Sequence, residues 1–154
     1  MNEESKTTIT LLTKEARQEH ADLHKLLETV RNQIGKCSEG KPGQAGSCLV
    51  KVMKQLCEHV ENHFDREENG GWLEEAVVRL PHLSRRLRVL ERQHKPLSER
   101  VRSLLAFAET FDGRSESVEQ LRNNFEVFSR LLLIHELSED RLLQRGFNED
   151  LELA

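Results

Sequence analysis

The sequence predicts an all-α protein, an antiparallel four-helix bundle in up-down-up-down order. Four long segments carry apolar residues at alternating spacings of three and four. Charged residues make up 32% of the chain, Gly and Pro are sparse, and Tyr is absent, which suits helices with polar outer faces. At this length we expect one domain over residues 1–154, with its core at about 8–146.

Two long helices are expected in the first half of the chain. The first covers about 8–34, and Gly35 is expected to end it. A glycine-rich loop should follow over 35–47, with Ser47 as the N-cap of a second helix over about 48–69. The Asn-Gly-Gly sequence after that helix is a typical stop.

The second half begins with a short amphipathic segment and continues with two more long helices. The segment 72–81 is too short for a bundle helix and is expected to pack over one end of the bundle. The third helix should cover about 82–112 and the fourth about 117–145, closed by Gly146.

Composition excludes several classes of partner and location. The formal net charge of -4 is spread over interspersed acidic and basic residues, which does not suit nucleic acid or an anionic membrane surface. The N-terminus lacks the order of a signal peptide and no apolar run approaches the ~18 residues of a membrane span, so we expect a cytoplasmic protein. Cys37, Cys48 and Cys57 are interpreted as structural thiols, with a Cys37–Cys48 disulfide under oxidation as the alternative.

Six polar residues occupy positions inside the apolar stripes, where a polar side chain needs a partner. They are His20, His63, Glu67, His94, His135 and Glu139. Counted from the predicted loops at one end of the bundle, the histidines lie 15 to 18 residues along their helices. At 1.5 Å per residue this depth is roughly 22 to 27 Å for all four, so the imidazoles should converge at one level.

Convergent imidazoles and carboxylates favour a metal site over hydrogen-bonded core histidines. Two His-x-x-x-Glu pairs place nitrogen and oxygen ligands on one helix face, and four such helices can enclose two cations bridged by carboxylates. This ligand set suits Fe, Mn or Zn, and six side chains leave coordination positions open. His24 and His59 lie on the flanks of their stripes, His82 is expected to be exposed, and Asp140 is held as a reserve ligand.

Five of these six residues lie in three motifs, HFDREENGGW at 63–72, the segment from Pro81 to ERQH at 91–94, and HELSE at 135–139. These motifs closely resemble those of the hemerythrin-like HHE cation-binding family. The likeness covers residues 10–145 with the motifs in the family's order. The resemblance implies a four-helix bundle with a non-haem di-iron centre, iron being expected ahead of manganese or zinc, and the six residues match its ligand positions.

Two departures separate the chain from the oxygen-carrying members of that family. Ser98 stands where they have the second histidine of HxxxH, and the last motif reads most naturally as HxxxE, ending at Glu139, instead of HxxxxD, which would end at Asp140. The expected function is therefore a di-iron protein with open positions for O2, NO or peroxide, acting in the sensing or handling of oxygen, iron, or oxidative or nitrosative stress. The alternatives are a di-iron oxidase or peroxidase, and a metal-filled helical interaction module without small-molecule chemistry. A protein that binds metal and small ligands is expected ahead of a turnover enzyme.

Overall fold

The computed structural model describes residues 3–37, 42–111 and 114–153. These residues form helices and no strand, which confirms the all-α fold class. The elements are α1 (Glu3–Cys37), α2 (Pro42–Glu68), α3 (Trp72–Arg79), the 3-10 turn η1 (Pro81–Leu83), α4 (Ser84–Glu109) and α5 (Ser115–Leu153).

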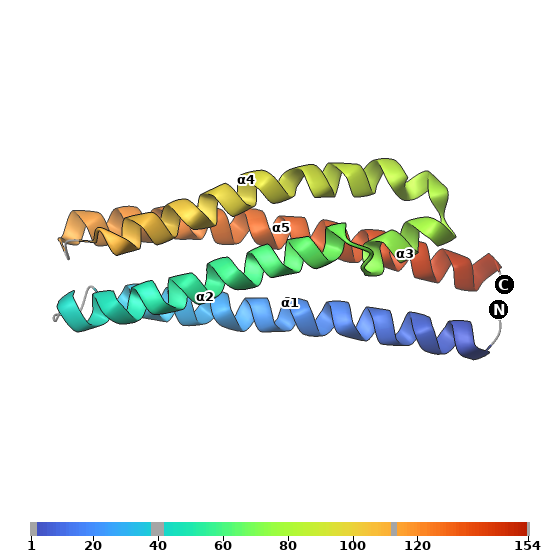
Figure 1. Cartoon of the computed structure of the whole chain (residues 1–154), viewed down its shortest axis with the longest axis horizontal. Coiled ribbons are helices and arrows are strands. Elements are labelled where there is room, and N and C mark those ends of the chain that lie inside the picture. The colour runs from blue at the N-terminus through green and yellow to red at the C-terminus, as the bar shows by residue number, and fades with distance from the viewer. Residues whose placement is uncertain (1–2, 38–41, 112–113, 154) are drawn as a thin grey trace.

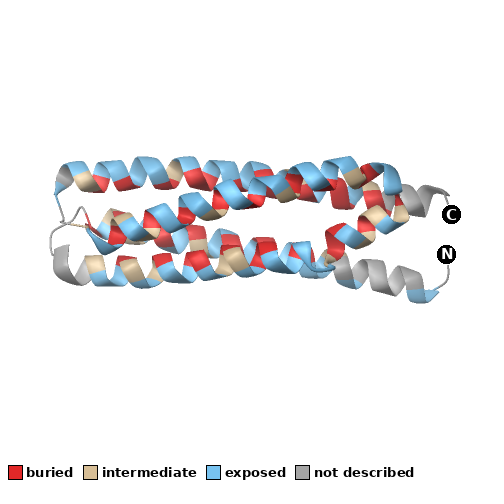
Figure 2. Ribbon diagram, turned by 45° about the horizontal axis from the view of Figure 1, so that its top comes forward, coloured by how far each residue is buried: buried red, intermediate tan, exposed pale blue. Residues whose placement is uncertain are grey.

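The four long helices surround one elongated interior. Helix α1 packs against α2 and α5, and α4 packs against the same two helices, so each long helix has two neighbours. Both ends of the chain lie at one end of the bundle, near which the short helix α3 packs on α5 (Figure 1). Buried residues follow the inward faces of the helices in Figure 2, as the periodic stripes predict.

Several helices are longer than the sequence suggested. Helix α1 continues through Gly35, and α2 begins at Pro42, so Ser47 lies inside a helix and is not its N-cap. A glycine in a helix costs only about 1 kcal/mol, which burial of neighbouring apolar residues offsets. Pro42 suits the first helical turn because backbone N–H groups have no helical acceptor there, so the N–H that proline lacks is not needed. The predicted end of the third helix at residue 112 lies outside the described residues, and α4 ends at Glu109.

The predicted stop after the second helix is confirmed, whereas the predicted stop at Gly146 is wrong. Gly70 takes a positive φ of 90°, which glycine adopts without strain, and α2 ends just before it. Gly146 instead lies inside α5, where α3 approaches closely. A Cβ atom at this position would lie 2.6 Å from the Cβ of Ala76. The glycine therefore makes room for α3.

We expect Gly146→Ala to destabilise the protein by about 1 to 3 kcal/mol, because the added methyl group must push α3 away from α5. Urea denaturation would measure the change in unfolding free energy. Gly35→Ala is the matched control, since a Cβ there meets nothing within 4 Å, and it should be neutral or stabilising by up to about 1 kcal/mol. Equal stability of the two variants would contradict the packing role of Gly146.

The apolar core is divided into two clusters. The larger includes Leu23, Phe64 and Leu132, and the smaller, beside α3, includes Ala16 and Leu142. Because His20 lies between Ala16 and Leu23 in α1, and the other inward polar residues occupy the same level, a polar layer separates the clusters. The position of this layer is set by the stripe pattern of each helix.

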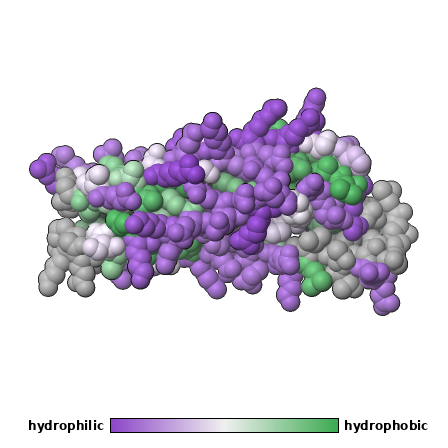
Figure 3. Space-filling view, in the orientation of Figure 1, coloured by the Kyte–Doolittle hydropathy of each residue, from purple (hydrophilic) through white to green (hydrophobic). Residues whose placement is uncertain are grey.

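The outer surface is polar on the face displayed in Figure 3, apart from smaller hydrophobic areas. Within the described part of the chain, no helix combines the length and apolar character that crossing a membrane requires. The cytoplasmic location and the single-domain organisation stay predictions. All three cysteines are free thiols, with Cys37 and Cys57 buried and Cys48 exposed.

Candidate metal centre

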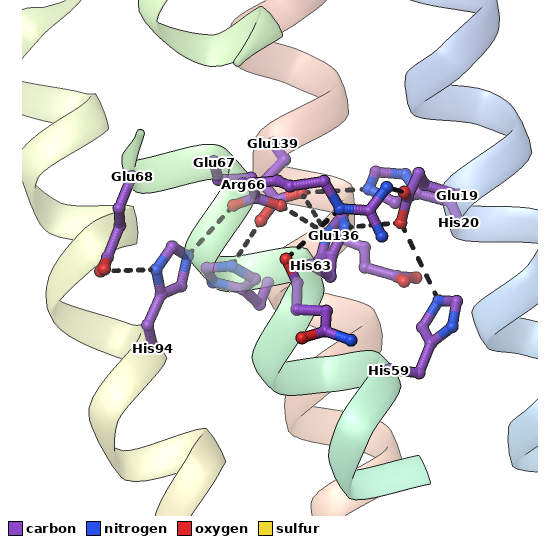
Figure 4. A network of polar contacts seen from close by, with 12 residues as sticks. Glu19, His20, His59, His63, Arg66, Glu67, Glu68, His94, Glu136 and Glu139 are labelled. Carbon is purple, nitrogen blue, oxygen red and sulfur yellow. Dashed lines mark hydrogen bonds and ion pairs between the residues drawn. The ribbon is translucent and has the colours of Figure 1, made fainter. Parts of the chain in front are cut away.

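Each of the four long helices contributes polar side chains to one buried layer. Every member replaces an apolar residue of an inward stripe, so its own helix directs it into the interior. The members are His20 from α1, His63 and Glu67 from α2, His94 from α4, and His135 and Glu139 from α5. All six are between 0% and 6% exposed, and those labelled in Figure 4 point toward one another. The structure thus brings together all six residues predicted from the sequence.

The carboxylate of Glu139 lies at the centre of this layer. Its Oε2 is 3.0 Å from Nε2 of His20 and 3.7 Å from Nε2 of His63. Its Oε1 is 2.5 Å from Nε2 of His135, one helical turn earlier in α5. One fully buried carboxylate therefore touches imidazoles from three helices.

The carboxylate of Glu67 joins the layer from α2. One oxygen contacts Nε2 of His63, and the other lies 3.1 Å from Nε2 of His94. The ligand atoms fall into two groups, and within each group they all lie within 4.8 Å of one another. We call these groups site A (His20, His63, Glu67 and Glu139) and site B (Glu67, His94, His135 and Glu139). Both glutamates belong to both sites, as two cations with bridging carboxylates would require.

Most inward atoms of this layer lack hydrogen-bond partners among the described residues. They are Nε2 of His63, His94 and His135, both carboxylate oxygens of Glu67, and Oε1 of Glu139. These atoms are close to one another, but they do not meet hydrogen-bond geometry. Buried polar atoms are almost always satisfied in folded proteins, so a cluster of orphaned donor atoms needs another partner. Nitrogen and oxygen atoms that converge on a common point fit a metal cation.

Each of the four imidazoles also contacts a side chain outside the layer through Nδ1, the ring nitrogen on the opposite side from the centre. Nδ1 of His20 lies 3.0 Å from Asp140, Nδ1 of His63 lies 3.1 Å from Glu19, and Nδ1 of His94 lies 3.0 Å from Glu68. Nδ1 of His135 lies 2.8 Å from Oε1 of Gln93. We call Glu19, Glu68, Gln93 and Asp140 the outer acceptors. Since each can accept a hydrogen bond from Nδ1–H, they leave every Nε2 free to face the centre.

The outer acceptors form a closed ring around the bundle. Each comes from the helix next to the histidine it holds: α1 supports α2, α2 supports α4, α4 supports α5, and α5 supports α1. Each also stands directly beside a layer residue in the sequence, for example Glu19 before His20 and Asp140 after Glu139. A step of one residue turns a side chain by about 100° around the helix, which aims it at the flank of the neighbouring helix.

Nearby carboxylates strongly perturb the pKa values of His20 and His63. Burial, the largest influence, lowers the pKa of His20 and of His63, but close contacts with nearby carboxylates and the charges of those carboxylates together raise both values from 6.5 to about 10. Burial likewise raises the pKa of Glu139, but its imidazole partners, His135 first, hold it well below its usual 4.5. Without a cation, protons on His20 and His63 therefore balance the negative charge of buried Glu139. A cation must displace those protons.

Aromatic side chains cover the layer on the α2 side. Phe64 is 3% exposed and stacks on His94, with ring centroids 4.1 Å apart and an interplanar angle of 7°. Trp72 of α3 is 5% exposed, and its ring centroid lies 5.8 Å from that of His63. These rings fix two imidazoles and keep bulk water from this side of the centre.

The other candidates from the sequence lie outside sites A and B. Asp140 is not a ligand of either site, because α5 stays a regular α-helix here and the side chain turns outward to Nδ1 of His20. His24 is an exposed partner of Glu136, at 2.7 Å, and His59 lies 3.9 Å from Glu19. His82 is exposed, as expected.

Sequence reasoning missed the outer acceptors Glu19, Glu68 and Gln93 and the burial of Glu136, and it gave Asp140 a different role, that of a reserve ligand. Glu136 is 3% exposed although it follows His135 directly, because α1 covers this side of α5. The adjacency of each missed residue to a layer residue was a usable signal. This adjacency in the sequence does not identify which neighbouring helix the side chain can contact, because that depends on the order of the helices around the bundle.

The fold and the site together define a class, that of helical bundles with an internal metal-binding layer. The sequence matches the hemerythrin HHE cation binding domain over residues 11–147. The chain therefore belongs to this family, which confirms the resemblance drawn from its motifs. Comparisons with curated proteins and with solved structures found no match.

Proposed function

We propose that this protein binds a pair of non-haem iron ions and presents their open coordination positions to O2, NO or peroxide. The ligands would be His20, His63, Glu67, His94, His135 and Glu139. The observation that carries this proposal is the overlap of sites A and B, which share both glutamates and contribute two imidazoles each. Each cation would then be bound by two imidazole nitrogens that belong to its site alone and by the carboxylates of Glu67 and Glu139, which belong to both sites.

The donor set favours iron over zinc. All the donors are imidazole nitrogens and carboxylate oxygens, and no thiol belongs to either site. Structural zinc is usually closed by four ligands and often by thiolates, whereas dinuclear iron and manganese centres in helix bundles use histidine and glutamate. Iron with fewer than six protein ligands keeps positions open for small molecules.

The chain's own residues have separate roles in this centre. The four Nε2 atoms would fix the cations, Glu67 and Glu139 would bridge them, and the outer acceptors would hold the imidazoles in place. Phe64 would limit access of water. When bound, an iron pair supplies ferrous and ferric oxidation states and sites for small ligands.

We further infer an up-down-up-down order of the long helices and a role in the sensing or handling of oxygen, iron, or oxidative or nitrosative stress. The helix order is supported by Figure 1, in which both chain ends lie at one end of the bundle. The stress-related role is supported by family membership together with a set of donor atoms that suits a redox-active metal and would leave coordination positions open.

Metal analysis and absorption spectra test the proposal directly. Protein purified without added metal should contain iron in excess of zinc and manganese, and loading with iron should approach two ions per chain. In air, the ferric pair should show near-ultraviolet charge-transfer bands that disappear on reduction. Iron-replete protein without these bands, or a zinc-filled protein that rejects iron, would count against the proposal.

A further inference from the structure

We propose that sites A and B bind iron unequally, that site A fills first, and that Gln93 is the positioning residue that keeps site B weaker. This inference rests on the proposed dinuclear function. The inner ligands give no reason for a difference, because each site has two imidazoles and the same two glutamates. Any difference must come from what surrounds those ligands.

The ring of outer acceptors is the first source of asymmetry. Both histidines of site A are held by carboxylates, Asp140 behind His20 and Glu19 behind His63. In site B the outer acceptor of His94 is also a carboxylate, that of Glu68 (Figure 4). His135 is held by the neutral amide oxygen of Gln93. A carboxylate acceptor makes an imidazole a stronger electron donor to a metal than an amide does, so His135 is the weakest ligand of the four.

A buried charge beside site A is the second source. Glu136 is 3% exposed, lies near enough to His20 and Glu139 to act on both electrostatically, and has one oxygen without a hydrogen-bond partner among the described residues. Its other oxygen lies 2.7 Å from His24. Arg66 pairs with Glu19 and offsets part of the negative charge around site A.

Charges of Asp140 and Glu136 therefore remain on the side of site A, whereas Glu68 is the only outer carboxylate of site B. Because negative charge near a cation in a low-dielectric interior strengthens its binding, both sources act in the same direction. Site A should hold iron more tightly than site B.

Anaerobic titration with iron(II) against a competing chelator would test this assignment through two variants that change one outer acceptor each. Two binding steps alone would not decide, because the first cation repels the second even in equivalent sites. Asp140→Asn should weaken the first step by about tenfold and leave the second nearly unchanged. Gln93→Glu should tighten the second step by about tenfold and leave the first nearly unchanged.

Equivalent sites give the opposite pattern, which makes the test selective. With equivalent sites, Asp140→Asn would weaken only the second step and Gln93→Glu would tighten the first, and either result would overturn the inference. Gln120→Glu, exposed and roughly 22 Å along α5 from His135, is the control for added charge and should change neither step.

Mössbauer spectra of protein given one equivalent of enriched iron should show one doublet, whereas two equal doublets would also overturn the inference of unequal sites. A failure of wild-type protein to bind two irons would instead overturn the proposed function.

Discussion

Replacing Glu139 with glutamine is expected to prevent the protein from binding either of the two proposed irons. Glu139 is 0% exposed and is the carboxylate that contacts imidazoles from three helices. Because it belongs to both sites, its loss would remove one ligand from each proposed cation and one negative charge from the centre. An amide also directs N–H groups at the position of the metal. Iron analysis of purified variant protein, with the near-ultraviolet spectrum, measures this loss.

Glu119→Gln is the matched control, since it makes the same change on an exposed side chain of α5 roughly 30 Å away. His82→Ala serves as the control for loss of an exposed imidazole, and both should keep the wild-type iron content. Glu67→Ala should lose at least one iron. If Glu139→Gln retained full iron content and spectrum, this carboxylate would not be a ligand in either site.

Removal of the metal is expected to lower the melting temperature by about 8 to 16 °C. Binding to the folded state stabilises by about 4 kcal/mol when free metal exceeds Kd a thousandfold. For a chain of this size each kcal/mol shifts Tm by about 2 to 4 °C. Calorimetry with and without a chelator measures the shift. In Glu139→Gln the chelator should have no effect, and a wild-type Tm indifferent to chelator would contradict metal-linked folding.

The effect of the chelator should grow with pH. The pKa values of His20 and His63 are raised in the folded, metal-free protein from 6.5 to about 10. Their contribution to stability is therefore complete below pH 6.5 and is lost as pH rises toward about 10. Metal binding changes in the opposite direction, because fewer protons compete for the imidazoles at higher pH. A Tm difference that stays constant or shrinks above pH 6.5 would show that these imidazoles do not exchange protons for metal.

The stripe pattern of the four long helices is sufficient to predict the buried polar layer. A residue such as His94, placed between Leu90 and Leu97, has its direction fixed by the helical repeat alone, and equal depth along four helices follows from the rise per residue. The family motifs agree with the positions that this periodicity selects. Helix ends were less predictable, because packing of buried neighbours outweighs the local signals of Gly35 and Ser47.

By itself, the sequence determined which residues face the interior and at what level, since both depend only on the repeat of a single helix. The tertiary structure decided which neighbouring side chain supports each imidazole, why Glu136 is buried, and why α5 continues through Gly146. These features depend on the order and rotation of helices around the bundle. A helical period specifies the face of one helix, but it contains no information about the flank of the helix that lies against it.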